Sequence, residues 1–153
     1  MHIRSFQTSD ASGIKALISS IMKKEYPGDE KAYEYGDLEN IAQAYGNLKE
    51  RFLVMEESGE IIGTVGIKQD SDTTALLRRL FVHPSHRGRD IGLMLVDTAL
   101  DFCKLNNYKL VVFRATASMN PVIKLLTKKK NFLESERLMF NGIEVIVLHY
   151  RIC

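Results

Sequence analysis

The sequence has few cysteines and no long hydrophobic run, and both absences exclude classes of protein. Its two cysteines are Cys103, inside an apolar stretch, and Cys153, at the last position. Cysteines so placed form neither a disulfide framework nor a spaced metal cluster. We therefore expect the protein to be located in the reducing cytoplasm. The first residues lack an apolar signal core, and no stretch approaches the ~18 uninterrupted apolar residues of a membrane helix. We therefore expect no membrane partner.

The chain also carries little net charge. Lys and Arg number 21 against 19 Asp and Glu, which leaves +2. So small an excess gives no strong overall field for nucleic acid or an anionic membrane. Hydrophobic residues make up 45% and charged residues 26%, as in ordinary globular proteins. We expect a single domain over residues 1–153, in which any anion site is local.

The apolar pattern alternates between strand and helix periods. It predicts strands over 2–8, 51–57, 61–69, 74–82, 109–115, 133–140 and 143–151, and helices over 11–24, 37–45 and 91–106 and from 120 onward. The unbroken run Leu110-Val111-Val112-Phe113 suits a strand buried on both faces, so we place it parallel to 74–82, with 91–106 as the crossover helix. Asn141-Gly142 predicts a tight hairpin. The order indicates one mixed sheet with helices on both faces.

The segment from Leu76 to Leu95 carries the clearest chemical signal. It reads LLRRLFVHPSHRGRDIGLML, an apolar strand followed by a short basic loop and the start of a helix. A helix start presents unpaired backbone N–H groups and a partial positive charge. Gly88 lets an anion approach the backbone closely, and Arg87 and Arg89 add charge-assisted hydrogen bonds. The segment therefore predicts a diphosphate site.

The same segment resembles the GNAT superfamily of N-acetyltransferases. The family signature at this place is Arg or Gln, two residues, Gly, one residue, then Gly or Ala, and Arg87, Asp90 and Gly92 follow it with one substitution. The resemblance extends to LFVHPSHRG, to the Asn120 helix and to the final hairpin, and is strongest to small bacterial members. It implies the α/β (α+β) GNAT acyl-CoA N-acyltransferase fold, a single mixed sheet of about seven strands and about four helices, splayed at its two central parallel strands.

The resemblance also implies acetyl-CoA as cosubstrate. In the family the pantetheine arm lies between the two parallel strands, and an Asn at the start of the later helix touches the cofactor. Carried over by position, the cofactor-binding residues are Leu80, Phe81, Val82, Arg87, Gly88, Arg89, Asp90, Ile91, Gly92 and Asn120. The implied reaction is direct attack on the thioester by an amine of a small molecule or a protein, by a monomer or a homodimer.

Several positions depart from the family pattern. Asp90 replaces a Gly, but Asp tolerates a positive φ better than most residues and would leave the N–H groups in place. Leu76 stands at a frequent acidic position, Leu126 aligns with the frequent Tyr that protonates the thiolate, and Asn131 replaces another Gly. Because the usual acid and base are missing, a non-catalytic acyl-CoA binding or sensing module is the alternative function.

The segment between the first two expected helices contains residues that could replace the missing acid and base. Glu25, Tyr26 and Tyr33 could line an acceptor pocket there, and we assign a catalytic role to Glu25, as base, and to Tyr26. Arg78 and Arg79 could meet an acidic acceptor or the cofactor's phosphates, although surface pairing is the simpler interpretation and a bulge would be needed to turn both to one face.

The sequence indicates no metal site. His83 and His86 lie three residues apart in a loop without other ligands nearby, which makes them a poor metal pair. Cys103 falls on the apolar face of its helix, so we expect it to pack in the core.

Overall fold

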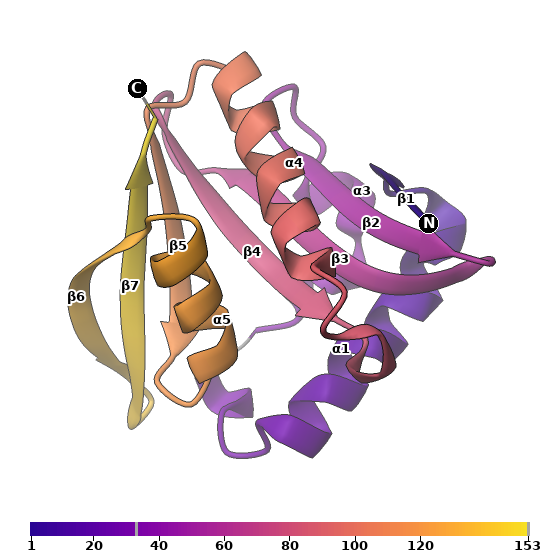
Figure 1. Ribbon diagram of the computed structural model, residues 1–153, viewed down its shortest axis with the longest axis horizontal. Coiled ribbons are helices and arrows are strands. Elements are labelled where there is room, and N and C mark those ends of the chain that lie inside the picture. Colours follow the sequence, from indigo (N-terminus) through magenta and orange to yellow (C-terminus); the bar gives the residue numbers. More distant parts are fainter. Residues whose placement is uncertain (33, 153) are drawn as a thin grey trace.

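A seven-stranded mixed sheet organises the protein, with strand order β1-β2-β3-β4-β5-β7-β6 (Figure 1). The computed structural model describes residues 1–32 and 34–152. Strands β4 and β5 are parallel, and the other neighbours are antiparallel. The strands are β1 His2–Ser5, β2 Arg51–Glu57, β3 Glu60–Gln69, β4 Thr74–Val82, β5 Leu110–Thr116, β6 Leu133–Phe140 and β7 Ile143–Arg151. The expected mixed sheet with a central parallel pair is confirmed.

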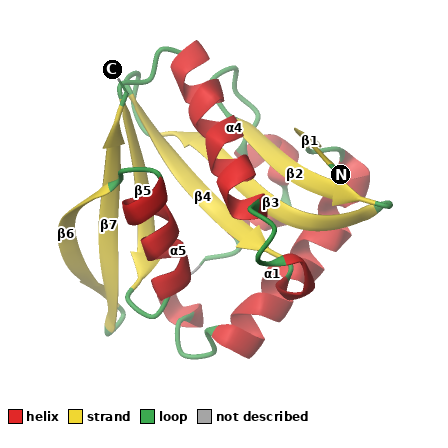
Figure 2. Cartoon of the chain, in the orientation of Figure 1, coloured by secondary structure: helices red, strands yellow, loops and turns green. Residues whose placement is uncertain are grey.

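Helices cover both faces of this sheet, as expected (Figure 2). Helices α4 and α5 lie in front of it in this view, and α1 lies behind. Their bounds are α1 Ala11–Glu25, α2 Gly36–Glu39, α3 Ile41–Ala44, α4 Ile91–Leu105 and α5 Asn120–Lys124, with a π-helical turn at Leu125–Lys129. Within the described residues, no helix is both long and apolar enough to cross a membrane.

The single helix expected over 37–45 is wrong, because the chain breaks at Asn40. Asn40 has φ −149° and ψ 80°, outside the helical region, and its side-chain oxygen accepts a hydrogen bond from the Gln43 N–H at 3.2 Å. This contact caps α3, so α2 and α3 form separately. Asp37, the first residue of the expected helix, lies inside α2 and binds an arginine of the sheet.

The two hairpins follow the local turn chemistry. Ser58-Gly59 and Asn141-Gly142 all have positive φ, between 50° and 79°, which is the conformation that tight two-residue hairpins require. The first strand is shorter than expected. It ends at Ser5 because Thr8–Asp10 forms a 3₁₀ turn that leads into α1. The hairpins and β4 therefore agree closely with the sequence prediction, while the N-terminal strand does not extend to Thr8.

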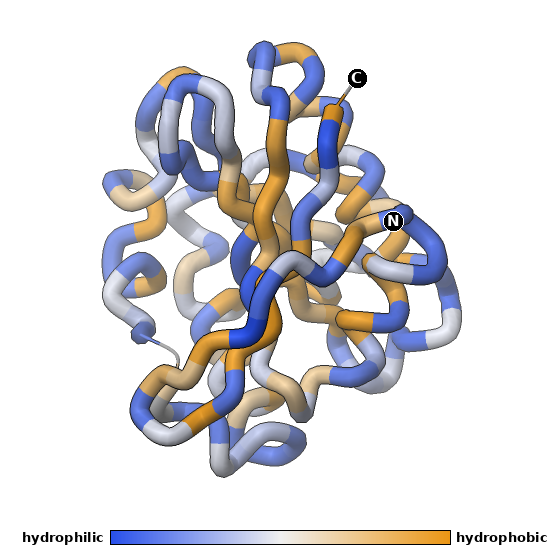
Figure 3. The backbone as a smooth tube through the Cα atoms, turned by 90° about the vertical axis from the view of Figure 1, so that its left-hand side faces the viewer, coloured by the Kyte–Doolittle hydropathy of each residue, from blue (hydrophilic) through white to orange (hydrophobic). Residues whose placement is uncertain are grey.

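The core lies between the sheet and the helices on its two faces. Figure 3 shows hydrophobic residues concentrated along strands in the middle of the molecule, with hydrophilic residues mostly around them. Cys103 is fully buried in this core, which confirms its expected packing role. Burial raises the pKa of its thiol to about 12, so the thiol stays protonated at neutral pH.

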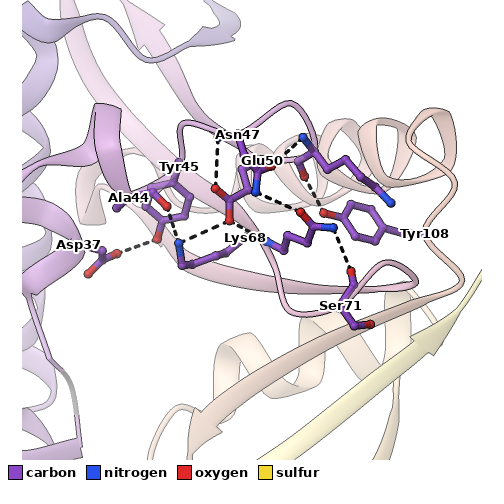
Figure 4. A network of polar contacts seen from close by, with 10 residues as sticks. Asp37, Ala44, Tyr45, Asn47, Glu50, Lys68, Ser71 and Tyr108 are labelled. Atoms are coloured by element: carbon purple, nitrogen blue, oxygen red, sulfur yellow. Dashed lines mark hydrogen bonds and ion pairs between the residues drawn. The ribbon is translucent and has the colours of Figure 1, made fainter.

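A polar network fastens the short helices to the sheet (Figure 4). The Lys68 ammonium on β3 donates to the Ala44 carbonyl at 2.5 Å and lies 3.4 Å from the Glu50 carboxylate. The Tyr45 hydroxyl donates to the Asp37 carboxylate at 2.6 Å. These contacts hold α2 and α3 against the sheet and fix Asp37 beside β4.

Candidate functional site

The two parallel strands pair over part of their length and then separate. Their cross-strand pairs run from Thr74 opposite Leu110 to Leu77 opposite Phe113, and none follows between the described residues. The strands diverge toward the carboxyl end of β4 in Figure 1. A bulge in β4 accompanies the separation, since the register between β3 and β4 shifts there and Arg79 adopts a φ of 54°. Bulges bend and twist a strand, which explains why β4 leaves β5.

Buried polar contacts lock this bulge. The Thr64 hydroxyl donates to the Arg79 carbonyl at 2.7 Å, and the Arg79 guanidinium lies 2.6 Å from the Asp37 carboxylate. Burial opposes ionisation of Asp37, but hydrogen bonds from Arg79 and Tyr45 outweigh it and hold the pKa of Asp37 below its ordinary value. Burial and the Asp37 charge raise the pKa of Tyr45. The bulge thus depends on a charged pair in the interior.

A cleft of about 1010 Å³ occupies the space between the separated strands. Most of its wall is apolar and comes from β4, β5, β6, β7, α4 and α5. Its charged lining residues are Glu34, Arg78, Arg79, Arg87, Asp90 and Arg114. An apolar cleft with a few charged groups is the usual form of a small-molecule site.

Most of the expected cofactor-binding residues lie in this cleft. Leu80, Phe81, Val82, Arg87, Gly88, Asp90, Ile91 and Gly92 line it. Arg89 does not, because its guanidinium turns toward β2 and binds the Glu57 carboxylate at 2.9 and 3.1 Å. Asn120 is exposed at the start of α5 and is also absent from the lining, although its neighbours Met119 and Pro121 belong to it.

The loop before α4 has the backbone conformation that its sequence suggested. Asp90 has φ 59° and ψ 21°, in the left-handed region, and Gly88 has φ 82°. Asn131, the other residue that replaces a family Gly, has φ 61°. Asp and Asn enter this region more readily than most residues, which explains how both substitutions keep the turn.

Arg87 connects this loop to the end of α1. Its guanidinium binds the Glu25 carboxylate with N–O distances of 2.6 and 2.9 Å and donates to the Val82 carbonyl at 3.2 Å. Glu25 is therefore held at the rim and does not line the cleft, whereas Tyr26 does. Burial, with the charge of Glu25, raises the pKa of the Tyr26 phenol. Tyr33 lies outside the described residues.

Two of the departures from the family pattern have different surroundings. Leu76 lines the cleft, so an apolar side chain stands where the family frequently has an acid. Leu126 is fully buried in the core and does not line the cleft. The missing tyrosine at this position therefore leaves no gap in the cleft wall.

Sequence reasoning missed two charged groups of the cleft. Arg114 on β5 and Glu34 before α2 both line it. The available signal for Arg114 was a lone cation within an otherwise apolar strand, LVVFRAT. Glu34 gave no comparable signal, because an acidic residue in a connecting segment is normally on the surface.

Comparisons with known proteins agree with this architecture. The model of the acetyltransferase (GNAT) family matches residues 16–132. A probable N-acetyltransferase camello of Xenopus tropicalis is 29% identical over 126 residues, 81% of this chain and 52% of that protein. An N-acetylaspartate synthetase of Danio rerio is 36% identical over 67 residues, 43% of this chain and 24% of that protein.

Solved structures share the fold over nearly the whole chain. A putative acetyltransferase of Salmonella typhimurium, solved with acetyl-CoA, superimposes with a TM-score of 0.78 at 17% identity, covering 98% of this chain and 92% of that one. The chain thus spans about half or less of its two curated relatives and almost all of this structural neighbour. With a family match over most of its length and a sheet that separates at its central parallel strands, the chain belongs to the acetyltransferase (GNAT) family.

Proposed function

We propose that the protein transfers the acetyl group of acetyl-CoA to an amine. The observation that carries this proposal is the cleft between the separated strands, which leads onto the Gly88 loop at the start of α4. Family membership and the structural neighbour solved with acetyl-CoA support it. We further propose a cytoplasmic location, in agreement with the buried free thiol of Cys103.

The pyrophosphate binds at the start of α4 in this proposal. The backbone N–H groups from Gly88 to Gly92 face it, and Arg87 neutralises part of its charge. The pantetheine arm then follows the edge of β4 that β5 leaves unpaired, from Val82 toward Leu80. Arg89 contributes only after its guanidinium leaves Glu57, and Asn120 contributes from the rim.

The chemical step needs an unprotonated amine close to the thioester. The amine nitrogen bonds to the acetyl carbonyl carbon, the carbon–sulfur bond breaks, and the coenzyme leaves as a thiolate while the nitrogen loses a proton. An alkylamine of pKa ~10.4 must lose that proton, whereas a thiolate of pKa ~8.5 leaves without strong acid assistance. Positioning and backbone N–H groups near the developing oxyanion supply most of the acceleration.

Glu25 and Tyr26 are the proposed acid–base groups. In the structure Glu25 neutralises Arg87, so a pyrophosphate that takes over Arg87 frees the carboxylate at the mouth of the cleft. The freed Glu25 accepts the amine proton, directly or through water. Tyr26, whose raised pKa keeps its phenol protonated, donates to the leaving sulfur.

Glu25→Gln tests the proposed base. General-base catalysis contributes about 100-fold or more, so we expect kcat at saturating acetyl-CoA to fall by about 100-fold. Glu39→Gln, an exposed carboxylate paired with Lys15, is the control. An unchanged kcat in Glu25→Gln would remove Glu25 from the chemistry.

Two experiments test the overall function, a binding measurement followed by a turnover assay. Calorimetry with coenzyme A and acetyl-CoA should give saturable heat on the folded protein, and an amine panel should then release free thiol in proportion to amine. Binding without amine-dependent thiol release would favour an acyl-CoA sensing module, the function suggested by the substitutions at Leu76, Asp90 and Leu126. Absence of heat with either ligand would overturn the proposal.

A further inference from the structure

Two arginines mark the point at which β4 and β5 separate. The last cross-strand pair joins Leu77 to Phe113, and Arg78 and Arg114 are the next residues on their strands. Both line the cleft. They therefore stand on opposite walls of the cleft, at its closed end.

The strand register turns both side chains to the same face of the sheet. Leu76 pairs with Val112, and side chains two residues apart on a strand share a face, so Arg78 and Arg114 follow Leu76 and Val112. The same face continues into β7, where Arg114 is paired with Val147. Arg114 is exposed and Arg78 is half-buried.

Neither guanidinium forms a direct ion pair with a carboxylate of the described residues. The other two arginines of the cleft differ, since Arg79 binds Asp37 and Arg87 binds Glu25. Among the described residues, Arg78 and Arg114 form no hydrogen bond or ion pair, although the charge of Arg78 helps to lower the pKa of Asp37. Two neighbouring cations repel each other, and an anion bound between them removes that repulsion.

The anion that fits this place belongs to the acceptor and not to the cofactor. Arg78 precedes Val82 by four residues, about 13 Å along a strand, so it lies well away from the pyrophosphate loop. All phosphates of coenzyme A lie on the far side of the pantetheine arm from the thioester. A guanidinium pair near the thioester therefore faces the second substrate, and its planar donors match a carboxylate.

We propose that the acceptor is a small primary amine that carries a carboxylate, which Arg78 and Arg114 bind. This inference rests on the proposed acetyl transfer. Glu34 is an exposed carboxylate that lines the same cleft. Its negative charge attracts the ammonium group of such an acceptor before the amine loses its proton. The acceptor is small because it must share a cleft of about 1010 Å³ with the pantetheine arm.

The orientation follows from these charges. The carboxylate of the acceptor binds the two guanidinium groups, and its amine points toward the thioester along the cleft. After proton loss the nitrogen forms the amide bond to the acetyl carbon, the carbon–sulfur bond breaks, and the product keeps its carboxylate on the arginines. Arg78 and Arg114 thus bind substrate without exchanging a proton, because guanidinium groups stay charged.

The first test compares matched acceptors by free-thiol release. Each pair compares an acceptor with its amide, such as L-aspartate against L-aspartic acid diamide, in which both carboxylates are replaced, or β-alanine against β-alaninamide. Phosphoethanolamine and a short peptide amidated at its C-terminus are further arms. We expect kcat/KM to be at least 10-fold higher for carboxylates than for their amides. A preference for amides, for phosphoethanolamine or for the peptide would overturn the proposal while leaving acetyl transfer intact.

The second test compares variants. Arg78→Gln and Arg114→Gln should each lower kcat/KM for the carboxylate acceptor by about 10- to 100-fold, mainly through KM, since each removes hydrogen bonds to a charged group. The loss should be several-fold smaller for the amide acceptor, because the amide lacks the charge that the guanidinium groups bind. Arg78→Lys should restore part of the loss.

Arg151→Gln is the matched control, since Arg151 is exposed at the end of β7 and outside the cleft. Equal losses with carboxylate and amide acceptors would overturn the role of the two arginines. Coenzyme binding without thiol release from any amine would overturn the proposed acetyl transfer itself. The two failures are therefore distinguishable.

Discussion

Two regions of the molecule use arginine–carboxylate pairs in opposite ways. At the β4 bulge, Arg79 and Asp37 are only 2% and 7% exposed. At the loop before α4, Arg87 and Glu25 are 44% and 29% exposed, and Arg89 and Glu57 are 44% and 28% exposed. A buried pair is costly to break, whereas an exposed pair exchanges readily with another ion. The buried pair at the bulge therefore stabilises the fold. At the loop, a ligand anion can displace the carboxylate that binds the arginine.

The largest effect should come from breaking the buried pair. Asp37→Asn removes the carboxylate that binds the buried Arg79 guanidinium, and we expect the free energy of unfolding to fall by about 3–5 kcal/mol. Urea denaturation followed by circular dichroism measures it. Glu57→Gln at the exposed pair should change this free energy little. Equal losses in the two variants would contradict the distinction between the regions.

The same contrast should appear in the pH dependence of stability. The folded-state pKa of Asp37 is below its unfolded value, so its contribution is full above about pH 4 and is lost as pH falls through the folded pKa. The stability difference between wild type and Asp37→Asn should therefore shrink on acidification. Urea midpoints of both proteins from pH 6 to pH 3 test this. A difference that stays constant would mean that Asp37 is not the titrating group.

A moderate effect is expected where the loop meets the cofactor. Arg87→Gln should weaken coenzyme A binding by about 10-fold through the loss of charge-assisted hydrogen bonds to phosphate. Arg89→Gln should weaken it by less than about threefold, because Arg89 turns toward Glu57. Calorimetry measures both dissociation constants. The reverse order would identify Arg89 as the principal ligand.

A small effect in the opposite direction should come from Asp90. Asp90→Gly removes a negative charge near the proposed pyrophosphate and relieves a left-handed residue at φ 59°, so coenzyme A affinity should rise by about threefold. Asp101→Asn, an exposed change further along α4, is the control and should leave affinity unchanged. Weaker binding in Asp90→Gly would show that the aspartate contributes to the loop's geometry.

Features set by neighbouring residues could be predicted from the sequence. The Asn141-Gly142 hairpin, the bounds of β4 and the crossover helix α4 follow from turn chemistry and periodicity over a few residues. The loop from Arg87 to Gly92 was recognisable because its residues stand side by side in the chain. These parts of the fold and of the site needed no information from distant segments.

Features that depend on distant partners could not be predicted. The bulge at Arg79 requires the register of β3 and the buried carboxylate of Asp37, which is 42 residues away. The contact between Arg87 and Glu25 spans 62 residues. The place of Arg114 in the cleft depends on the parallel register between β4 and β5. Tertiary packing decided each case, and no local pattern encodes it.

The separation of β4 from β5 also has a consequence for local unfolding. Beyond Leu77 the edge of β4 that faces β5 has no cross-strand partner among the described residues, although β4 remains central in the sheet. Amide protons there should exchange with solvent faster than those on the edge that faces β3. An extended molecule lying along that edge would slow their exchange, as an added strand does.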